Sequence, residues 1–362
     1  MNSDRLTHAV VDWGGLHRRA TAVWLVTAVF AGSVSHVRAQ DFVTNVSNKG
    51  TVAAAFLEIG IGARAVAMGG TYVAEKGRME MIYWNPAGLA HVEGLGLSFT
   101  HAEWLADTNF EFFTLAKPLP FFNGVLAASI TALSVPSQPV RTVLEPEGTG
   151  ESYTAQDYAV SMSVATKLIP SFSVGVTGKY IGQRIWSESA SQLALDVGVH
   201  YQTPLAGLAL GASISNFGPD MRLAGKNLTN IIDPDLANRG IENIPVVYKT
   251  DGFPLPQIFR FGMAYETPMP GRGNLTTLVS LMHPTGSTES MSVGMEYGFS
   301  QLIFFRAGYQ NLFERDAISG LTLGGGLQYK LRRRHSIAFD YAYSDWSILQ
   351  KVHRVTLSMS FQ

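Results

Sequence analysis

The sequence predicts an all-β fold, a transmembrane β-barrel of about 14 antiparallel strands with an N-terminal hatch, or plug, inside its lumen. Segments that alternate apolar and polar residues fill almost all of the chain after Gly94. The last segment, VTLSMSFQ, places four apolar side chains on one face of a strand and small polar ones on the other. Because that polar face cannot build a core, we expect lipid outside the closed sheet and a wet or plugged lumen inside it.

Each strand is predicted from its own run of alternation. Most runs are about 10 residues long, which lets a strand cross a bilayer at a tilt near 45°. An even number of strands is typical of a bacterial single-chain barrel. The predicted strands cover residues 94–103, 107–117, 122–135, 152–168, 172–186, 191–203, 208–217, 257–267, 274–283, 289–299, 301–311, 318–330, 335–344 and 351–361.

The links between the predicted strands support this count. Outer-membrane barrels have short periplasmic turns and longer outer loops, with the C-terminus on the periplasmic side. Counted back from the last strand, the two longest links, 136–151 and 218–256, both fall on the outer side. The short links 167–171, 203–207, 267–273 and 330–334 fall on the other side.

Tyrosines at four strand ends fit the same orientation. They lie on the apolar face of their strands at the periplasmic rim, where Tyr rings prefer the headgroup level: Tyr201, Tyr265, Tyr297 and Tyr329. The alternative is a soluble sandwich with ordinary strand aromatics. The missing second apolar face favours the membrane interpretation.

Residues 1–39 are predicted to be an export signal. Three basic residues, His17–Arg19, precede the apolar run ATAVWLVTAVFAGSV, and Val37 and Ala39 stand at the −3 and −1 positions of a cleavage site. The alternative is a membrane anchor, but the run is too short. An exported chain with a two-residue periodicity indicates the bacterial outer membrane.

Composition excludes several classes of function. The chain has 362 residues and no cysteine, so it has no disulfides and no thiolate metal site. Its net charge of −1 implies no nucleic-acid partner. No stretch of about 20 apolar residues follows residue 40, which argues against a helical membrane protein.

Residues 40–93 differ from the predicted barrel, residues 94–362. Ala, Gly and Met dominate, and several glycines break any long helix. We place this segment inside the barrel as the hatch because it is too apolar and irregular to stand free in water. Within it, Arg64 can donate several hydrogen bonds to the wall, Gly69 and Gly70 permit a tight turn, Trp84 offers a large anchor, and Asn85 and Pro86 redirect the chain toward the first strand.

Charged side chains on the inward face predict a polar network in the lumen: Lys179, Asp196, Arg260, Glu266, Glu296, Arg306 and Asp340. They could line a path for a ligand or an ion, or they could brace the wall against the hatch. We favour the structural role because charges in barrel lumens are common.

No motif for catalysis, a cofactor or a metal is found. The chain has neither a G-x-S-x-G elbow nor an H-E-x-x-H zinc helix, and its nine histidines are scattered. We therefore expect a protein that is not an enzyme.

Residues 49–89 resemble the PorV/PorQ family of the wider FadL-like group of outer-membrane proteins. The similarity lies in KGTVAAAFLEIGIGARAVAMGGTYVAE followed by YWNPAGLA, and it extends to HAEWLADTNFEFFTLAKPL and DYAYSDWSILQKVHRVTLSMSF. The resemblance implies a 14-stranded barrel with an N-terminal hatch. It also implies type IX secretion, with a translocon barrel, a sortase or the C-terminal domains of exported cargo as partners.

Three functions follow. The first is a secretion-associated binding partner, with residues 218–256 as its partner surface. The second is a FadL-like channel for hydrophobic small molecules. The third is an outer-membrane hydrolase, which ranks last because no positioned nucleophile and base are recognised.

Overall fold

The computed structural model describes residues 50–119, 123–233, 243–269, 271, 273–314, 317–332 and 335–361. The predicted signal peptide, the first ten residues of the predicted hatch and Phe122 lie outside these ranges. No helix among the described residues is long and apolar enough to cross a membrane.

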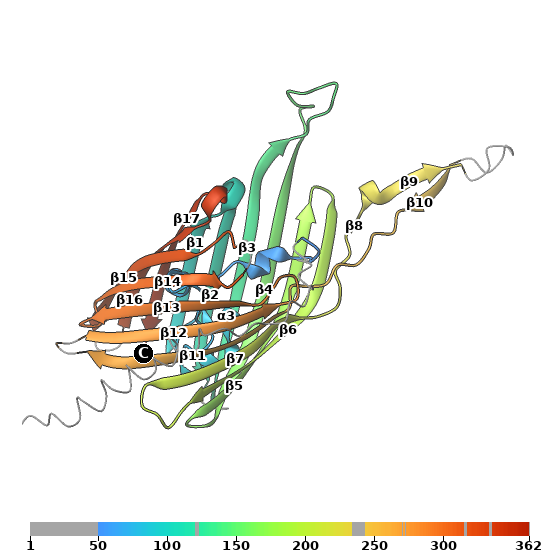
Figure 1. Cartoon of the computed structure of the whole chain (residues 1–362). Helices are drawn as coiled ribbons and strands as arrows, with labels where there is room; N and C mark the ends of the chain where they lie inside the picture. Colours follow the sequence, from blue (N-terminus) through green and yellow to red (C-terminus); the bar gives the residue numbers. More distant parts are fainter. Residues whose placement is uncertain are drawn as a thin grey trace, which may run out of the picture. The chain divides into compact units, whose positions relative to one another are not determined.

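The described residues after Gly94 form a closed antiparallel β-barrel (Figure 1). A 15-stranded sheet contains the two-residue β8 (Ala224–Gly225), and without it fourteen strands remain in the wall. β1 pairs with β17 and β5 pairs with β6, so the ring has no free edge. The strands are β1 (Leu95–Glu103), β2 (Asn109–Leu119), β3 (Gly124–Pro139), β4 (Ser152–Ile169), β5 (Phe172–Ile185), β6 (Glu188–Gln202), β7 (Leu208–Phe217), β11 (Ile258–Met269), β12 (Gly273–Pro284), β13 (Ser290–Phe299), β14 (Ile303–Leu312), β15 (Leu321–Arg332), β16 (His335–Asp345) and β17 (Lys351–Phe361).

The predicted fold class is confirmed, and each predicted segment is a strand of the wall. The predicted bounds of β7 and β17 agree with the structure, and most others differ by a few residues. β3 continues beyond its predicted end at Val135 to Pro139, with an irregular register between Val135 and Gln138. Proline is tolerated at such a bulge because no ladder hydrogen bond is required there. The predicted loop 218–256 contains β8, which pairs with β6, and a hairpin formed by β9 (Thr229–Ile232) and β10 (Ile244–Val247).

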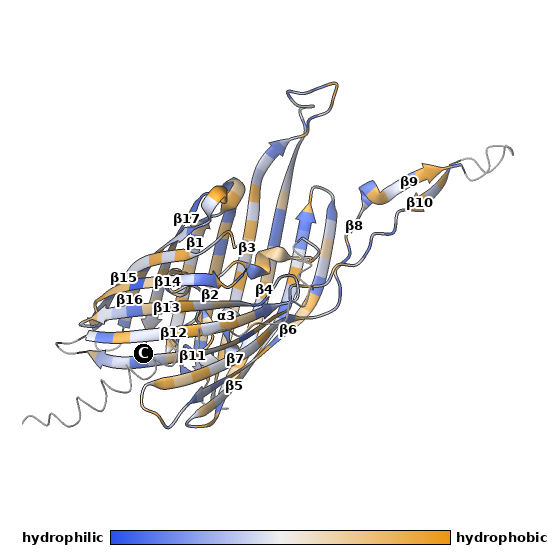
Figure 2. Cartoon of the chain, in the orientation of Figure 1, coloured by the Kyte–Doolittle hydropathy of each residue, from blue (hydrophilic) through white to orange (hydrophobic). Residues whose placement is uncertain are grey.

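The two faces of the wall differ as the alternation predicts. In β17, Arg354, Thr356 and Ser358 are buried, whereas Val355 and Leu357 are exposed. The same outward apolar positions recur around the ring, and hydrophobic and hydrophilic residues alternate along the strands in Figure 2. Large exposed residues include Phe99, Phe113, Val160, Val176, Leu195, Ile214, Phe261, Met295, Phe305, Leu323 and Phe339. Such side chains are stable outside a barrel only where lipid covers them.

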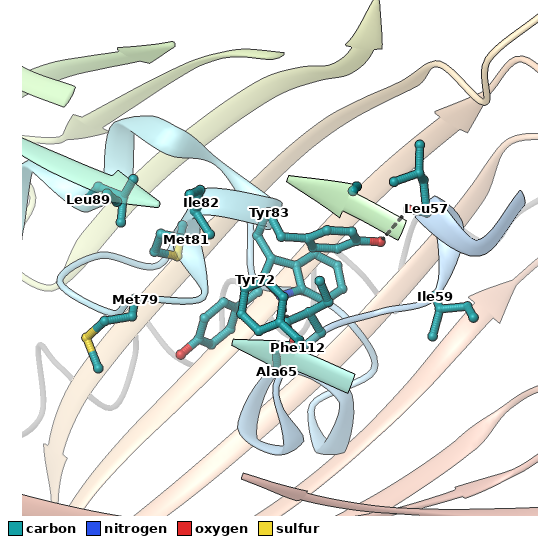
Figure 3. Packing of buried hydrophobic residues seen from close by; sticks show 14 of the residues in the cluster. Leu57, Ile59, Ala65, Tyr72, Met79, Met81, Ile82, Tyr83, Leu89 and Phe112 are labelled. Atoms are coloured by element: carbon teal, nitrogen blue, oxygen red, sulfur yellow. Dashed lines mark hydrogen bonds between the residues drawn. The ribbon is translucent and has the colours of Figure 1, made fainter. Parts of the chain in front are cut away.

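Residues 50–94, which we call the inner segment, pack against the inward face of the wall. The segment contains four short helical turns, η1 (Ala55–Glu58), α2 (Ala63–Ala67), α3 (Met81–Trp84) and η2 (Pro86–His91). Figure 3 shows its apolar side chains gathered beside Phe112 of β2. Phe112 is 1% exposed, and Tyr72 and Met81 of the inner segment are buried in the same cluster. The core of the molecule therefore lies between the inner segment and the wall.

Candidate functional site

Asn85 and Pro86 join the inner segment to β5 and β6. The buried Asn85 side chain donates to the carbonyls of Val73 (2.7 Å) and Val199 (2.9 Å) and accepts from the Ala87 N–H (3.1 Å), which caps η2. Its extended backbone, with φ −163°, and Pro86 at the first turn of η2 set the direction of the chain. The Asn-Pro element is thus a buried capping motif that also bonds to the wall.

Wall glycines let this element come close. A Cβ atom at Gly198 would lie 2.0 Å from the Asn85 side-chain oxygen, and one at Gly175 would lie 2.3 Å from the Pro86 carbonyl carbon. Both distances are far below van der Waals contact. The wall can therefore accept only glycine at these two positions while the inner segment stays where it is.

Gly69 and Gly70 end α2 in a tight turn. Their φ angles are +69° and +71°, a region that glycine enters without steric cost. The Gly70 N–H donates to the Ala65 carbonyl at 3.0 Å. A Cβ at Gly69 would also lie 2.9 Å from the Val293 carbonyl oxygen of β13. The turn therefore requires glycine both for its backbone angles and for its approach to the wall.

Trp84 is held in place by its indole nitrogen and by neighbouring rings. The Nε1–H donates to the Ile61 carbonyl at 2.9 Å. The Tyr83 ring stands edge-on to the Trp84 ring, with centroids 4.9 Å apart. The Arg260 guanidinium of β11 lies over Trp84 at 5.4 Å, so the ring also contacts the wall.

Arg64 connects the inner segment to a chain of alternating charges. Its Nε and one terminal nitrogen each donate to Glu296 of β13 at 2.8 Å, and another bond reaches Glu75 at 2.7 Å. Glu296 also accepts from Arg306 of β14, and Arg306 donates to Asp340 of β16 at 2.7 Å. Two cations and three carboxylates thus alternate from the inner segment across three strands of the wall.

Burial and charge act in opposite directions on Arg64. Burial alone lowers the pKa of its guanidinium, but Glu296, Tyr72 and Glu75 outweigh it, so the pKa is raised well above its usual value. Arg64 is therefore charged whenever the barrel is folded. A buried ion of this kind is tolerated only when its partners are in place.

The other predicted network residues do not all meet in one cluster. Lys179 of β5 pairs with Asp196 of β6 at 2.7 Å and also donates to Asn216, forming a separate group. Arg260 lies against Tyr83 and Trp84 and donates to Ser215 at 3.1 Å.

Glu266 was predicted to belong to the polar network, but within the described ranges it contacts none of the other predicted network residues. It shares the inward parity of β11 with Arg260 but sits near the end of the strand, where it is exposed and accepts from Asn274 at 3.1 Å. Parity alone does not show how far along the strand the inner segment reaches, and this explains the difference.

Three cavities follow one another along β16 and β17. The outer cavity, about 90 Å³, lies at the end of the barrel that carries the long loops and is lined by Trp84, Trp104, Trp346, Arg260, Arg354 and Ser344 among others. A small one of about 10 Å³ follows beside Arg64, Asp340 and Thr356. The inner cavity, about 210 Å³, lies at the short-turn end beside His91, Ser336 and Ser360. Together they mark a seam between the inner segment and the wall.

The seam is closed between the cavities by direct contacts. The Ala63 N–H donates to Thr356 Oγ1 at 2.8 Å, and Ser98 donates to Glu80 at 2.6 Å. Both bonds involve a hydroxyl group of the wall, which accepts in the first and donates in the second, whereas charged side chains form the contacts of Arg64 with β13.

Several residues of these sites were not predicted. Arg354 has the inward parity of β17, a signal that was present in the sequence. Trp104 and Trp346 lie outside the strands and pack edge-on at 5.1 Å, and no periodicity marks loop residues. Within the described ranges, no group of three or more side chains could hold a metal ion.

The fold is similar to that of two solved transporters. The toluene transporter TbuX of Ralstonia pickettii matches 84% of this chain and 99% of its own, with a TM-score of 0.51 and 14% identity. The toluene transporter TodX of P. putida matches 84% of this chain and 98% of its own, with a TM-score of 0.54 and 11% identity. A Pseudomonas aeruginosa FadL homologue matches 83% of this chain and 96% of its own, with a TM-score of 0.45 and 11% identity.

At these identities the likeness concerns the fold alone. No protein-family model matches the sequence, and a search of curated proteins finds no match. The function is therefore argued from the sites of this chain.

Proposed function

We propose that this chain is a non-enzymatic β-barrel of a bacterial outer membrane that admits small hydrophobic molecules at its long-loop end. In this proposal residues 1–39 are a signal peptide, residues 40–93 are the hatch and residues 94–362 are the barrel. One observation carries the proposal: an aromatic cavity lies on top of the inner segment, in a fold shared with two proteins described as toluene transporters.

The lining of the outer cavity suits a small apolar molecule. Trp84, Trp104 and Trp346 supply three indole rings, and aromatic faces bind apolar ligands through a large contact area. The further route follows the seam along β16 and β17. Passage there would break hydrogen bonds such as Ala63 to Thr356 and would run beside Arg64 and Asp340, which line the middle cavity.

Uptake of radiolabelled toluene by intact cells tests this function. Cells that carry the protein in their outer membrane should take up toluene faster than cells without it. Ser280→Phe places a ring in the outer cavity, because Ser280 lines it and is 5% exposed, and should lower the uptake rate severalfold. Leu281→Phe is the matched control, since Leu281 faces outward and is 50% exposed.

The proposal fails if toluene uptake does not depend on the protein. It fails equally if Ser280→Phe and Leu281→Phe barrels, present in equal amounts, pass toluene at the same rate.

A PorV/PorQ-type role in type IX secretion is a second candidate, and one observation favours it. The hairpin β9–β10 projects from the long-loop end in Figure 1 and exposes Ile231 and Val247, which are 61% and 69% exposed. Exposed apolar strands are suited to binding another protein.

A hairpin deletion tests this candidate. Residues 226–249 are replaced by a short Gly-Ser linker, which keeps Met221 and Leu255 because they are 2% and 0% exposed and belong to the core. Loss of co-purification with a translocon barrel, a sortase or cargo would support the candidate, and unchanged co-purification would refute it. Deletion of residues 141–149, the tip between β3 and β4, serves as the control.

A further inference from the structure

The barrel buries two cations without ion-pair partners among the described residues. Five arginine and lysine side chains are buried there: Arg64, Lys179, Arg260, Arg306 and Arg354. Three of them form ion pairs, and Arg260 and Arg354, 3% and 2% exposed, form none. Burying a charge without a partner is expensive, so these two positions require an explanation.

Both arginines line the outer cavity, and so do other donors that lack partners. Among the described residues, no hydrogen-bond acceptor reaches the Nε atoms of Arg260 and Arg354, the Trp346 Nε1 or the Ser344 Oγ. All four side chains line that one cavity. Buried donors in native proteins are usually satisfied, so four around one space indicate a missing acceptor.

Aromatic rings cover the faces of the two guanidinium groups. Arg260 lies over Tyr83 and Trp84 at 5.3 and 5.4 Å, and Arg354 lies over Trp104 at 5.7 Å. Cation–π contacts partly compensate for the lost hydration. The terminal nitrogens of Arg260 also donate to Ser215 at 3.1 Å and to Tyr83 at 3.5 Å, which leaves its Nε–H without an acceptor in the described part of the chain, as in Arg354. The N–H edge of a guanidinium matches the two oxygens of a carboxylate.

The cavity has the charge and the size for a small acid. The charged residues that line the cavity are one carboxylate, Glu58, and two guanidinium groups, Arg260 and Arg354. The cavity therefore has a lining with a net positive charge. Its volume of about 90 Å³ is several times the ~10–15 Å³ that one water needs. The indole rings provide a surface for a flat apolar body beside the charged end.

We propose that the outer cavity is a binding site for a small aromatic carboxylate, whose acid group bonds to Arg260 and Arg354 and whose ring packs on the tryptophans. This site goes beyond the proposed passage of neutral hydrophobic molecules, because binding requires no movement along the seam.

Titration calorimetry on the full barrel in detergent tests the site with benzoate, benzamide and inorganic phosphate. Benzoate should bind at least about tenfold more tightly than benzamide, because benzamide lacks the charge that the guanidinium groups recognise. Equal affinity for the two would overturn the proposal. Tighter binding of phosphate than of benzoate would also overturn it, since the site would then select an inorganic anion. These comparisons use the unmodified protein and need no variant to fold.

Variants locate the binding to these side chains. Arg260→Gln and Arg354→Gln should each weaken benzoate binding about tenfold or more, and Arg354→Lys should weaken it less because it keeps the charge. Arg184→Gln, at an exposed position of β5, is the matched control and should bind as the native barrel does. Native-like benzoate affinity in both glutamine variants would overturn the proposal. If the native barrel binds benzoate as expected but cells that carry it take up no more toluene than cells without it, the proposed channel function fails and the proposed binding site stands.

Discussion

Arg64 and Glu296 face each other as a fork and a carboxylate, with two hydrogen bonds of 2.8 Å between them. One residue belongs to the inner segment and the other to β13. Glu296 also accepts from Arg306 on the neighbouring strand. This single carboxylate therefore holds two guanidinium groups and ties the inner segment to the wall.

Removing this carboxylate should destabilise the barrel strongly. Glu296→Ala leaves Arg64 and Arg306 short of a partner in a buried site, and breaking a buried pair costs about 3–5 kcal/mol. Unfolding by denaturant in detergent measures the loss. Glu111→Ala is the control, because Glu111 is exposed and its pair with His101 spans 3.8 Å, so the change should cost less than about 1 kcal/mol. Similar losses in the two variants would contradict this account.

Asn85 should tolerate substitution poorly. Asn85→Ala removes the cap of η2 and leaves the carbonyls of Val73 and Val199 without this donor, which we expect to cost about 2–4 kcal/mol in all. The same unfolding measurement checks the value. Asn230→Ala, at an exposed position of β9, should change the free energy of unfolding little. A loss below about 1 kcal/mol for Asn85→Ala would show that water replaces these bonds.

The fold could be predicted from the sequence because two signals repeat around the barrel. Side-chain parity marks the lipid face of every strand, and link length separates the two ends of the barrel. The hairpins at the long-loop end follow neither signal. Residues 136–139 contain two prolines, which interrupt the strand pattern, so the predicted strand ended before β3 does. β9 and β10 have only four residues each. Short strands without a lipid face carry little periodicity.

The sequence predicted many of the residues that form these sites, but it did not predict which of them contact one another. The sequence identified four residues of the charged network: Arg64, Glu296, Arg306 and Asp340. Side-chain parity, however, does not show which position along each strand lies level with Arg64. That position depends on the stagger of the strands and on where the inner segment lies. Glu266 shows the consequence, since it has the correct face and lies beyond the inner segment. Trp104 and Trp346 show the other limit, because loop residues have no face to predict.

Gly198 should act as a contact point for the inner segment. Gly198→Ala places a Cβ where the Asn85 side-chain oxygen now lies, so the inner segment has to move away from β6. We expect faster hydrogen exchange of backbone amides in η2, measured by mass spectrometry. Gly178→Ala on β5 is the matched control, because a Cβ there meets nothing within 4 Å. Equal exchange in the two variants would mean that the contact does not hold the segment.

His91 should make stability fall on the acid side of neutrality. Burial lowers the pKa of its imidazole to about 3, and the nearby Lys167, His200 and Lys76 act in the same direction. In the unfolded chain the pKa is near 6.5, so below about pH 6.5 the unfolded state takes up a proton that the folded state refuses. The contribution of His91 is zero above that pH and increasingly unfavourable toward pH 3. Thermal unfolding of the native barrel and of His91→Gln between pH 7.5 and 4 should show a shallower acid-side decline in the variant, and parallel declines would rule out this role.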